Sequence, residues 1–129
     1  MNNKDKLNEE LIKLLCEQQK LEEMSAIRKK DYNLPVNIWI DDKGSERTNK
    51  HNLPRLKIQT TYEDKLDEKH LLSLSIDKKP KVLAGEMNEL KNKDFKIIKN
   101  FVIKNYDLLI QYWKQEIGLR ELLNKLQEL

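Results

Sequence analysis

The chain has 129 residues, of which 38% are hydrophobic and 36% are charged, and its 25 Lys+Arg against 22 Asp+Glu give a net charge of +3. This length suits one domain of ordinary size, and the longest apolar run is far shorter than the roughly 20 residues of a membrane-spanning helix. The polar first ten residues lack the pattern of a secretory signal. The single cysteine, Cys16, excludes an internal disulfide, so a cytoplasmic location is expected.

Residues 4–30 are predicted to form an amphipathic helix. This stretch contains no Pro or Gly, and Leu7, Leu11 and Leu14 recur at steps of three and four. The apolar stripe is narrow, so the helix should be stable only when it is docked on another surface.

After Pro35 the apolar period changes from the helical one to two, which indicates strands. Alternation predicts strands over 36–40, 56–62 and 72–76, and a short fourth strand or edge extension over 82–84. Hairpin order makes the sheet antiparallel with one polar face. Trp39 alternates with Ile38 and Ile40 and is therefore expected on that polar face.

Two helices should follow the sheet. Apolar residues at steps of three and four predict a long amphipathic helix over 93–116, and Gly118 allows a break before a leucine-rich helix over 118–129. The expected fold class is α+β, with a small antiparallel sheet of three to four strands packed on the long helix. The expected organisation is an N-terminal helix (1–32), a core domain (33–117) and a helical tail (118–129).

Three stretches carry a resemblance to a known family. They are Ile-Trp-Ile-Asp-Asp at 38–42, His-Asn-Leu-Pro-Arg-Leu-Lys at 51–57, and Asn-Tyr-Asp-Leu-Leu-Ile-Gln-Tyr-Trp at 105–113. Together they resemble the 4160 family of small bacterial domains of unknown function, over about residues 34–116. The resemblance implies a compact sheet-plus-helix module and a place in a toxin–antitoxin-like gene pair. Two of the three histidines in the family's central motif are replaced here by Arg55 and Lys57.

The sequence offers little for catalysis. One cysteine and two separated histidines, His51 and His70, do not supply the four ligands of a zinc site. The acidic pairs at 41–42, 63–64 and 67–68 could hold Mg²⁺, although neighbouring acids are more often solvated turn residues. No phosphate-binding loop or nucleophile motif is present. No catalytic residue, metal or cofactor is therefore predicted, and an enzyme is the less favoured class.

Three functional hypotheses follow. The first is a non-enzymatic interaction or regulatory module that self-associates or binds a partner protein through its terminal helices and Trp39. The residues expected to carry it are Leu7, Leu11, Leu14, Trp39, Leu122 and Leu126.

The second hypothesis is a nucleic-acid-binding regulator. Residues 43–57 and 91–104 each carry five cations and one acid. The expected contacts are Lys50, Arg55, Lys57, Lys96 and Lys104. Lysines greatly outnumber arginines, which favours solubility or a compositional drift of the genome over specific recognition of a nucleic acid. The third hypothesis is an atypical metal-dependent hydrolase or nuclease.

Overall fold

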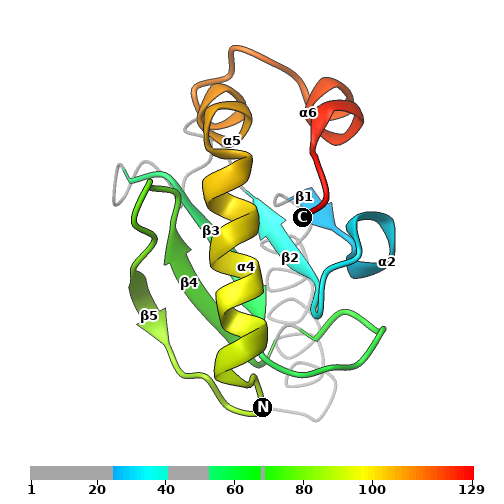
Figure 1. Ribbon diagram of the computed structural model, residues 1–129, viewed down its shortest axis with the longest axis vertical. Coiled ribbons are helices and arrows are strands. Elements are labelled where there is room, and N and C mark those ends of the chain that lie inside the picture. The colour runs from blue at the N-terminus through cyan, green and yellow to red at the C-terminus, as the bar shows by residue number, and fades with distance from the viewer. Residues whose placement is uncertain (1–24, 41–52, 68) are drawn as a thin grey trace, which may run out of the picture.

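The computed structural model describes residues 25–40, 53–67 and 69–129, and this part of the chain has an α+β fold. Its strands form one antiparallel sheet in the order β1-β2-β3-β4-β5. Helix α4 runs across one face of the sheet, α5 continues from its end, and α6 completes this layer (Figure 1). The α+β class predicted from the sequence is confirmed, but the sheet has five strands where three to four were expected. The strands are β1 (Ser25–Ile27), β2 (Ile38–Ile40), β3 (Arg55–Gln59), β4 (Leu71–Ser75) and β5 (Val82–Gly85).

Strand β1 lies where the sequence predicts the end of the first helix. Residues 25–27 pair with β2, with Ser25 opposite Ile40 and Ile27 opposite Ile38. The prediction of helix is therefore wrong over 25–28, and the expected domain boundary at residue 33 falls after the first strand of the sheet. Only the short helix α2 (Lys29–Tyr32) is helical here, and Asn33 ends it with a left-handed backbone (φ 56°). The rest of the predicted helix, with Leu7, Leu11 and Leu14, lies outside the described residues.

The core lies between the sheet and the helices. Cross-strand neighbours point to the same face of a sheet, and the row Ile27, Ile38, Ile58 and Leu72 runs across β1 to β4 on the face that the helices cover. All four side chains are at most 1% exposed and belong to one hydrophobic cluster with Phe101 of α4. Full burial of such a side chain contributes about 1.5–3 kcal/mol, so this row fixes the strand register.

The opposite face of the sheet carries polar residues around one tryptophan. The cross-strand row here is Ala26, Trp39, Lys57, Ser73 and Ala84. Trp39 lies outside the hydrophobic cluster that holds its neighbours Ile38 and Ile40, as strand alternation predicts. Its side chain is nevertheless only 1% exposed.

The long helix predicted over 93–116 is in fact two helices, α4 (Asn92–Lys104) and α5 (Tyr106–Trp113). Asn105 separates them, with φ −103° and ψ 17°. The last helix, α6 (Leu119–Lys125), follows Gly118 as predicted. It packs on the rest of the fold, because Leu122 and Leu126 belong to the same core cluster and Tyr32 of α2 donates a hydrogen bond to the Leu123 carbonyl.

A buried polar cluster fixes the connection between β3 and β4. Asn37 and Gln59 are both fully buried. The Gln59 amide nitrogen donates to the carbonyls of Glu63 and Lys65, and its oxygen accepts from the Asp67 backbone N–H at 3.1 Å. Because buried polar groups are costly without partners, these bonds hold the connection in one conformation.

Candidate functional site

Lysine side chains from two segments line a shallow depression beside α4. Its volume is about 430 Å³, and it lies between the turn that joins β4 to β5 and the side of α4. We call this depression the lysine groove. Its lining residues are Lys78, Lys79, Pro80 and Lys81 from the turn and Lys96, Lys99, Asn100 and Ile103 from the helix.

Local sequence places each lysine. Lys96, Lys99 and Ile103 are three and four residues apart, so they share one side of α4. Asp77 starts the turn, and its carboxylate accepts a hydrogen bond from the Lys79 backbone N–H at 3.4 Å. Ser75 closes the turn with two hydrogen bonds to Lys81. Its backbone N–H donates to the Lys81 carbonyl at 2.9 Å, and its hydroxyl accepts from the Lys81 backbone N–H at 2.8 Å. The two lysine segments, well apart in the sequence, therefore meet at one rim of the sheet.

Two of the lysines lie over aromatic rings. The Lys99 ammonium is 4.8 Å from the Phe95 ring centre, and the Lys78 ammonium is 5.8 Å from that of Tyr106. Such contacts hold a cation in place while its N–H groups keep their capacity to donate. None of the five groove lysines forms a salt bridge with a carboxylate of the described residues. No acidic residue lines the groove. The groove is thus a concentration of positive charge that the described part of the fold does not neutralise.

The structure brings together only part of the predicted nucleic-acid set. Lys96 lies in the groove, whereas the Lys104 ammonium donates to the Glu128 carbonyl of the C-terminal tail. Arg55 and Lys57 alternate with the core residues of β3 and so belong to the opposite face of the sheet, where the Lys57 ammonium donates to the Ser73 hydroxyl at 2.6 Å. Lys50 lies outside the described residues. The sequence did not single out Lys78, Lys79 and Lys81, because they read as ordinary turn residues.

Of the predicted partner-binding residues, the structure describes Leu122, Leu126 and Trp39, and these three are not surface groups. Leu122 is fully buried, Leu126 is 8% exposed and Trp39 is 1% exposed. These three side chains are therefore buried within a single chain, and their predicted role in binding a partner stays a prediction. The leucines that repeat at helical spacing in α6 form the face that packs on the core, and not an exposed apolar face.

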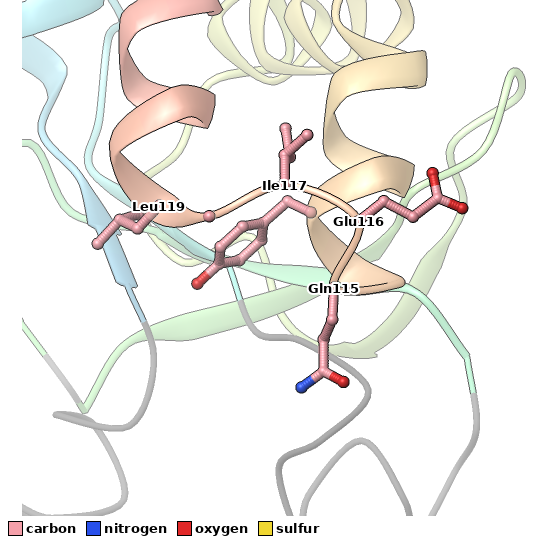
Figure 2. Close-up of a pocket in the computed structure, with 6 residues that line it drawn as sticks. Gln115, Glu116, Ile117 and Leu119 are labelled. Carbon is pink, nitrogen blue, oxygen red and sulfur yellow. The ribbon is translucent and has the colours of Figure 1, made fainter.

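A second hollow lies where α5 meets α6 (Figure 2). Its volume is about 370 Å³, and its lining includes Tyr112, Glu116 and Leu119. Gln115 at its rim has a left-handed backbone (φ 65°), and the Tyr112 hydroxyl is 2.9 Å from the Ser25 hydroxyl. This hollow mixes one acid with neutral groups and has no concentration of like charge, so it suggests no ligand class.

Two of the acids that the sequence offers for Mg²⁺ have other partners, and Asp41, Asp42 and Glu68 lie outside the described residues. The Asp64 carboxylate is 2.9 Å from the Lys29 ammonium, which lowers its pKa. The Asp67 carboxylate is 2.8 Å from the His70 ring, whose hydrogen bond holds the pKa of Asp67 below its usual value. Among the residues that the structure describes, no group of three or more His, Cys, Asp or Glu side chains is placed to hold a metal ion.

Comparison with known proteins adds no relative. No family model, no curated protein and no solved structure matches the chain. The resemblance to the 4160 family therefore stays a prediction. Within the described residues, no helix combines the length and apolar character needed to cross a membrane.

Proposed function

We propose that the protein is a non-enzymatic binding module whose lysine groove contacts the phosphate backbone of a nucleic acid. The single observation that carries the proposal is the convergence of Lys78, Lys79, Lys81, Lys96 and Lys99 on one depression without an acidic lining residue. It develops the nucleic-acid hypothesis drawn from the sequence, but of the residues expected there only Lys96 belongs to the groove.

Lysine chemistry supports backbone contact without base recognition. An ammonium group is a compact point charge, whereas bidentate recognition of guanine is usually made by arginine. All five cations of the groove are lysines. Each phosphate that a lysine neutralises releases condensed counterions, so binding should depend steeply on salt and little on sequence. Such a module would regulate by occupying the nucleic acid and not by catalysing a reaction on it.

The other two hypotheses have less support. Of the partner-binding residues expected from the sequence, the three that the structure describes are buried. A hydrolase would need a constellation of catalytic groups, and two of the described acids, Asp64 and Asp67, are engaged with Lys29 and His70.

The test is a salt series with the purified protein and two probes, a 20-base-pair DNA duplex and a single-stranded RNA of equal length. For five phosphate contacts on duplex DNA, the logarithm of the binding constant should fall with the logarithm of salt concentration with a slope of about −4.5. The variant Lys96→Gln/Lys99→Gln should reduce the steepness of that slope by about 2.

The matched control is Lys65→Gln/Lys114→Gln, which removes the same charge at two exposed lysines outside the groove. This control should keep the wild-type slope. The proposal is refuted if neither probe binds at low salt, or if the control variant loses as much binding as the groove variant.

A further inference from the structure

Strand β5 is an edge of the sheet whose outer side is not paired with any described strand. The sheet order places β5 at one end, next to β4 alone. All four of its residues are exposed, including Val82 at 48% and Leu83 at 41%. Figure 1 shows β5 at the rim of the sheet, on the side of α4 opposite β1 and β2. An exposed edge presents backbone N–H and C=O groups that can pair with another strand.

The sequence around β5 limits how that edge can be used. Pro80 precedes the strand and has no N–H to donate. The register shift between Ser73 and Leu74 makes the β4–β5 ladder irregular. Gly85 ends the strand with φ 91°. Pairing is thus restricted to the short segment Val82–Gly85, which favours one specific partner strand over open-ended aggregation.

The flanks of β5 carry opposite charges. Lys78, Lys79 and Lys81 precede the strand, and Glu86 and Glu89 follow it. Both acids and all three lysines are exposed, and none of them forms a salt bridge with a described residue. In an antiparallel pair the start of one strand lies beside the end of the other. Two copies of β5 paired in this way place the basic flank of each beside the acidic flank of the other.

We propose that the β5 edge is a self-association surface, on which a second copy of this chain adds its own β5 antiparallel to form a continuous ten-stranded sheet. When Ala84 of each copy faces Ala84 of the other and Leu83 stays the extra residue of the irregular ladder, Lys81 of each copy lies beside Glu86 of the other, and two-fold symmetry makes this ion pair twice. The chemistry that selects the partner is therefore charge complementarity along a self-complementary edge.

The symmetry has a consequence for the lysine groove. A two-fold axis that relates antiparallel edge strands of one sheet is perpendicular to that sheet, so α4 of both copies lies on the same face. The two grooves then form one basic surface beside the axis. This consequence rests on the proposed function. Repulsion between the grooves is screened at physiological salt, and bound polyanion would reduce it, so nucleic acid should favour the dimer.

The test measures self-association without nucleic acid, so its outcome is independent of the proposed phosphate binding. Sedimentation of the full chain from about 10 µM to about 1 mM covers the range expected for a short strand pair. The wild type should show a reversible monomer–dimer equilibrium. Lys81→Glu and Glu86→Lys should each raise the dissociation constant by about tenfold or more, since each replaces two attractive pairs by two repulsive ones. The double variant Lys81→Glu/Glu86→Lys should restore it.

Matched controls separate this edge from other surfaces. Lys65→Glu reverses an equal charge at an exposed lysine outside β5 and should leave the equilibrium unchanged. Circular dichroism checks that each variant is folded. A wild type that stays monomeric at about 1 mM overturns the proposal. So does a dimer that survives both single reversals, or one that the double variant fails to restore.

Discussion

Asn105 and Gln127 are hydrogen-bonded in both directions. The Gln127 backbone N–H donates to the Asn105 side-chain oxygen at 2.8 Å, and the Asn105 side-chain nitrogen donates to the Gln127 carbonyl at 2.9 Å. The same nitrogen donates to the Phe101 carbonyl at 3.0 Å. One side chain, 2% exposed, thus lies at the break between α4 and α5 and fixes the C-terminal tail against it.

Replacing Asn105 by aspartate tests this clamp. Asn105→Asp keeps the acceptor and removes the donor, so a carboxylate faces the carbonyls of Phe101 and Gln127. Leaving buried polar groups unpaired is costly, and we expect the free energy of unfolding in urea to fall by about 2–4 kcal/mol at neutral pH. Asn124→Asp, at an exposed position of α6, should change it by less than about 0.5 kcal/mol. Equal effects of the two substitutions would contradict the role of Asn105 in fixing the C-terminal tail.

Gln59 has a similar role at the other connection. Its amide nitrogen bonds three backbone carbonyls, those of Thr61, Glu63 and Lys65. Gln59→Met keeps the approximate shape of the side chain and removes every hydrogen bond that the side chain makes. We expect a loss of about 3 kcal/mol in the free energy of unfolding, with faster amide hydrogen exchange over residues 61–67. Gln127→Met is the control, because the Gln127 side chain is exposed and only its backbone is held. Unchanged exchange over 61–67 in Gln59→Met would contradict the assigned role.

Sequence periodicity was reliable where one face of an element is buried. Ile38, Leu56 and Leu72 alternate with more polar neighbours because only one side of each strand meets the helices, and β2 to β4 were predicted on this basis. Strand β1 was missed because Ser-Ala-Ile at 25–27 has no alternation of its own. Its strand conformation comes from pairing with β2, a contact between segments that local pattern does not report.

The candidate site was predicted only in small part. Of the five groove lysines, Lys96 alone was among the contacts expected from the sequence, and it is exposed. Lys78, Lys79 and Lys81 carry the signature of a turn, and nothing local indicates that this turn lies beside α4. For α6 the error was the reverse, since the leucine repeat marked an apolar face without showing that the chain's own core covers Leu122.

Two glycines offer a matched pair of substitutions. Gly85 has φ 91°, and a side-chain carbon there would lie 2.5 Å from the Leu71 carbonyl oxygen, on the rigid backbone of β4. Gly85→Ala should therefore lower the free energy of unfolding by about 1–3 kcal/mol. At Gly118 the same carbon would meet nothing within 4 Å. Gly118→Ala should change the free energy of unfolding by less than about 1 kcal/mol, since alanine restricts the unfolded chain but is a poorer residue than glycine at the N-cap of α6. Thermal unfolding of both variants is the measurement, and a Gly85→Ala protein as stable as the wild type would contradict the close approach.

The Asp67–His70 pair predicts a defined dependence of stability on pH. The Asp67 carboxylate also accepts hydrogen bonds from the Thr61 hydroxyl and the Lys69 backbone N–H, both at 3.0 Å. The hydrogen bond from His70 is the largest cause that lowers the pKa of Asp67 below its ordinary value of 3.8, and those from Lys69 and Thr61 act in the same direction. A carboxyl group whose pKa is lower in the folded state binds fewer protons there than in the unfolded chain. Its contribution to stability is therefore fully present above pH 3.8 and is lost as the pH falls through the lower folded pKa.

The measurement compares the wild type with Asp67→Asn in urea between about pH 2 and pH 6. The difference in free energy of unfolding should be constant above about pH 5 and should shrink in the acid range, because only the wild type loses a carboxylate. His70→Ala removes the first cause of the lowered pKa, so repeating the comparison in that background should give a smaller change with pH. A difference between wild type and Asp67→Asn that stays the same across the whole range would show that the pair makes no pH-dependent contribution, and a change of equal size in the His70→Ala background would assign that contribution to Thr61 and Lys69 instead.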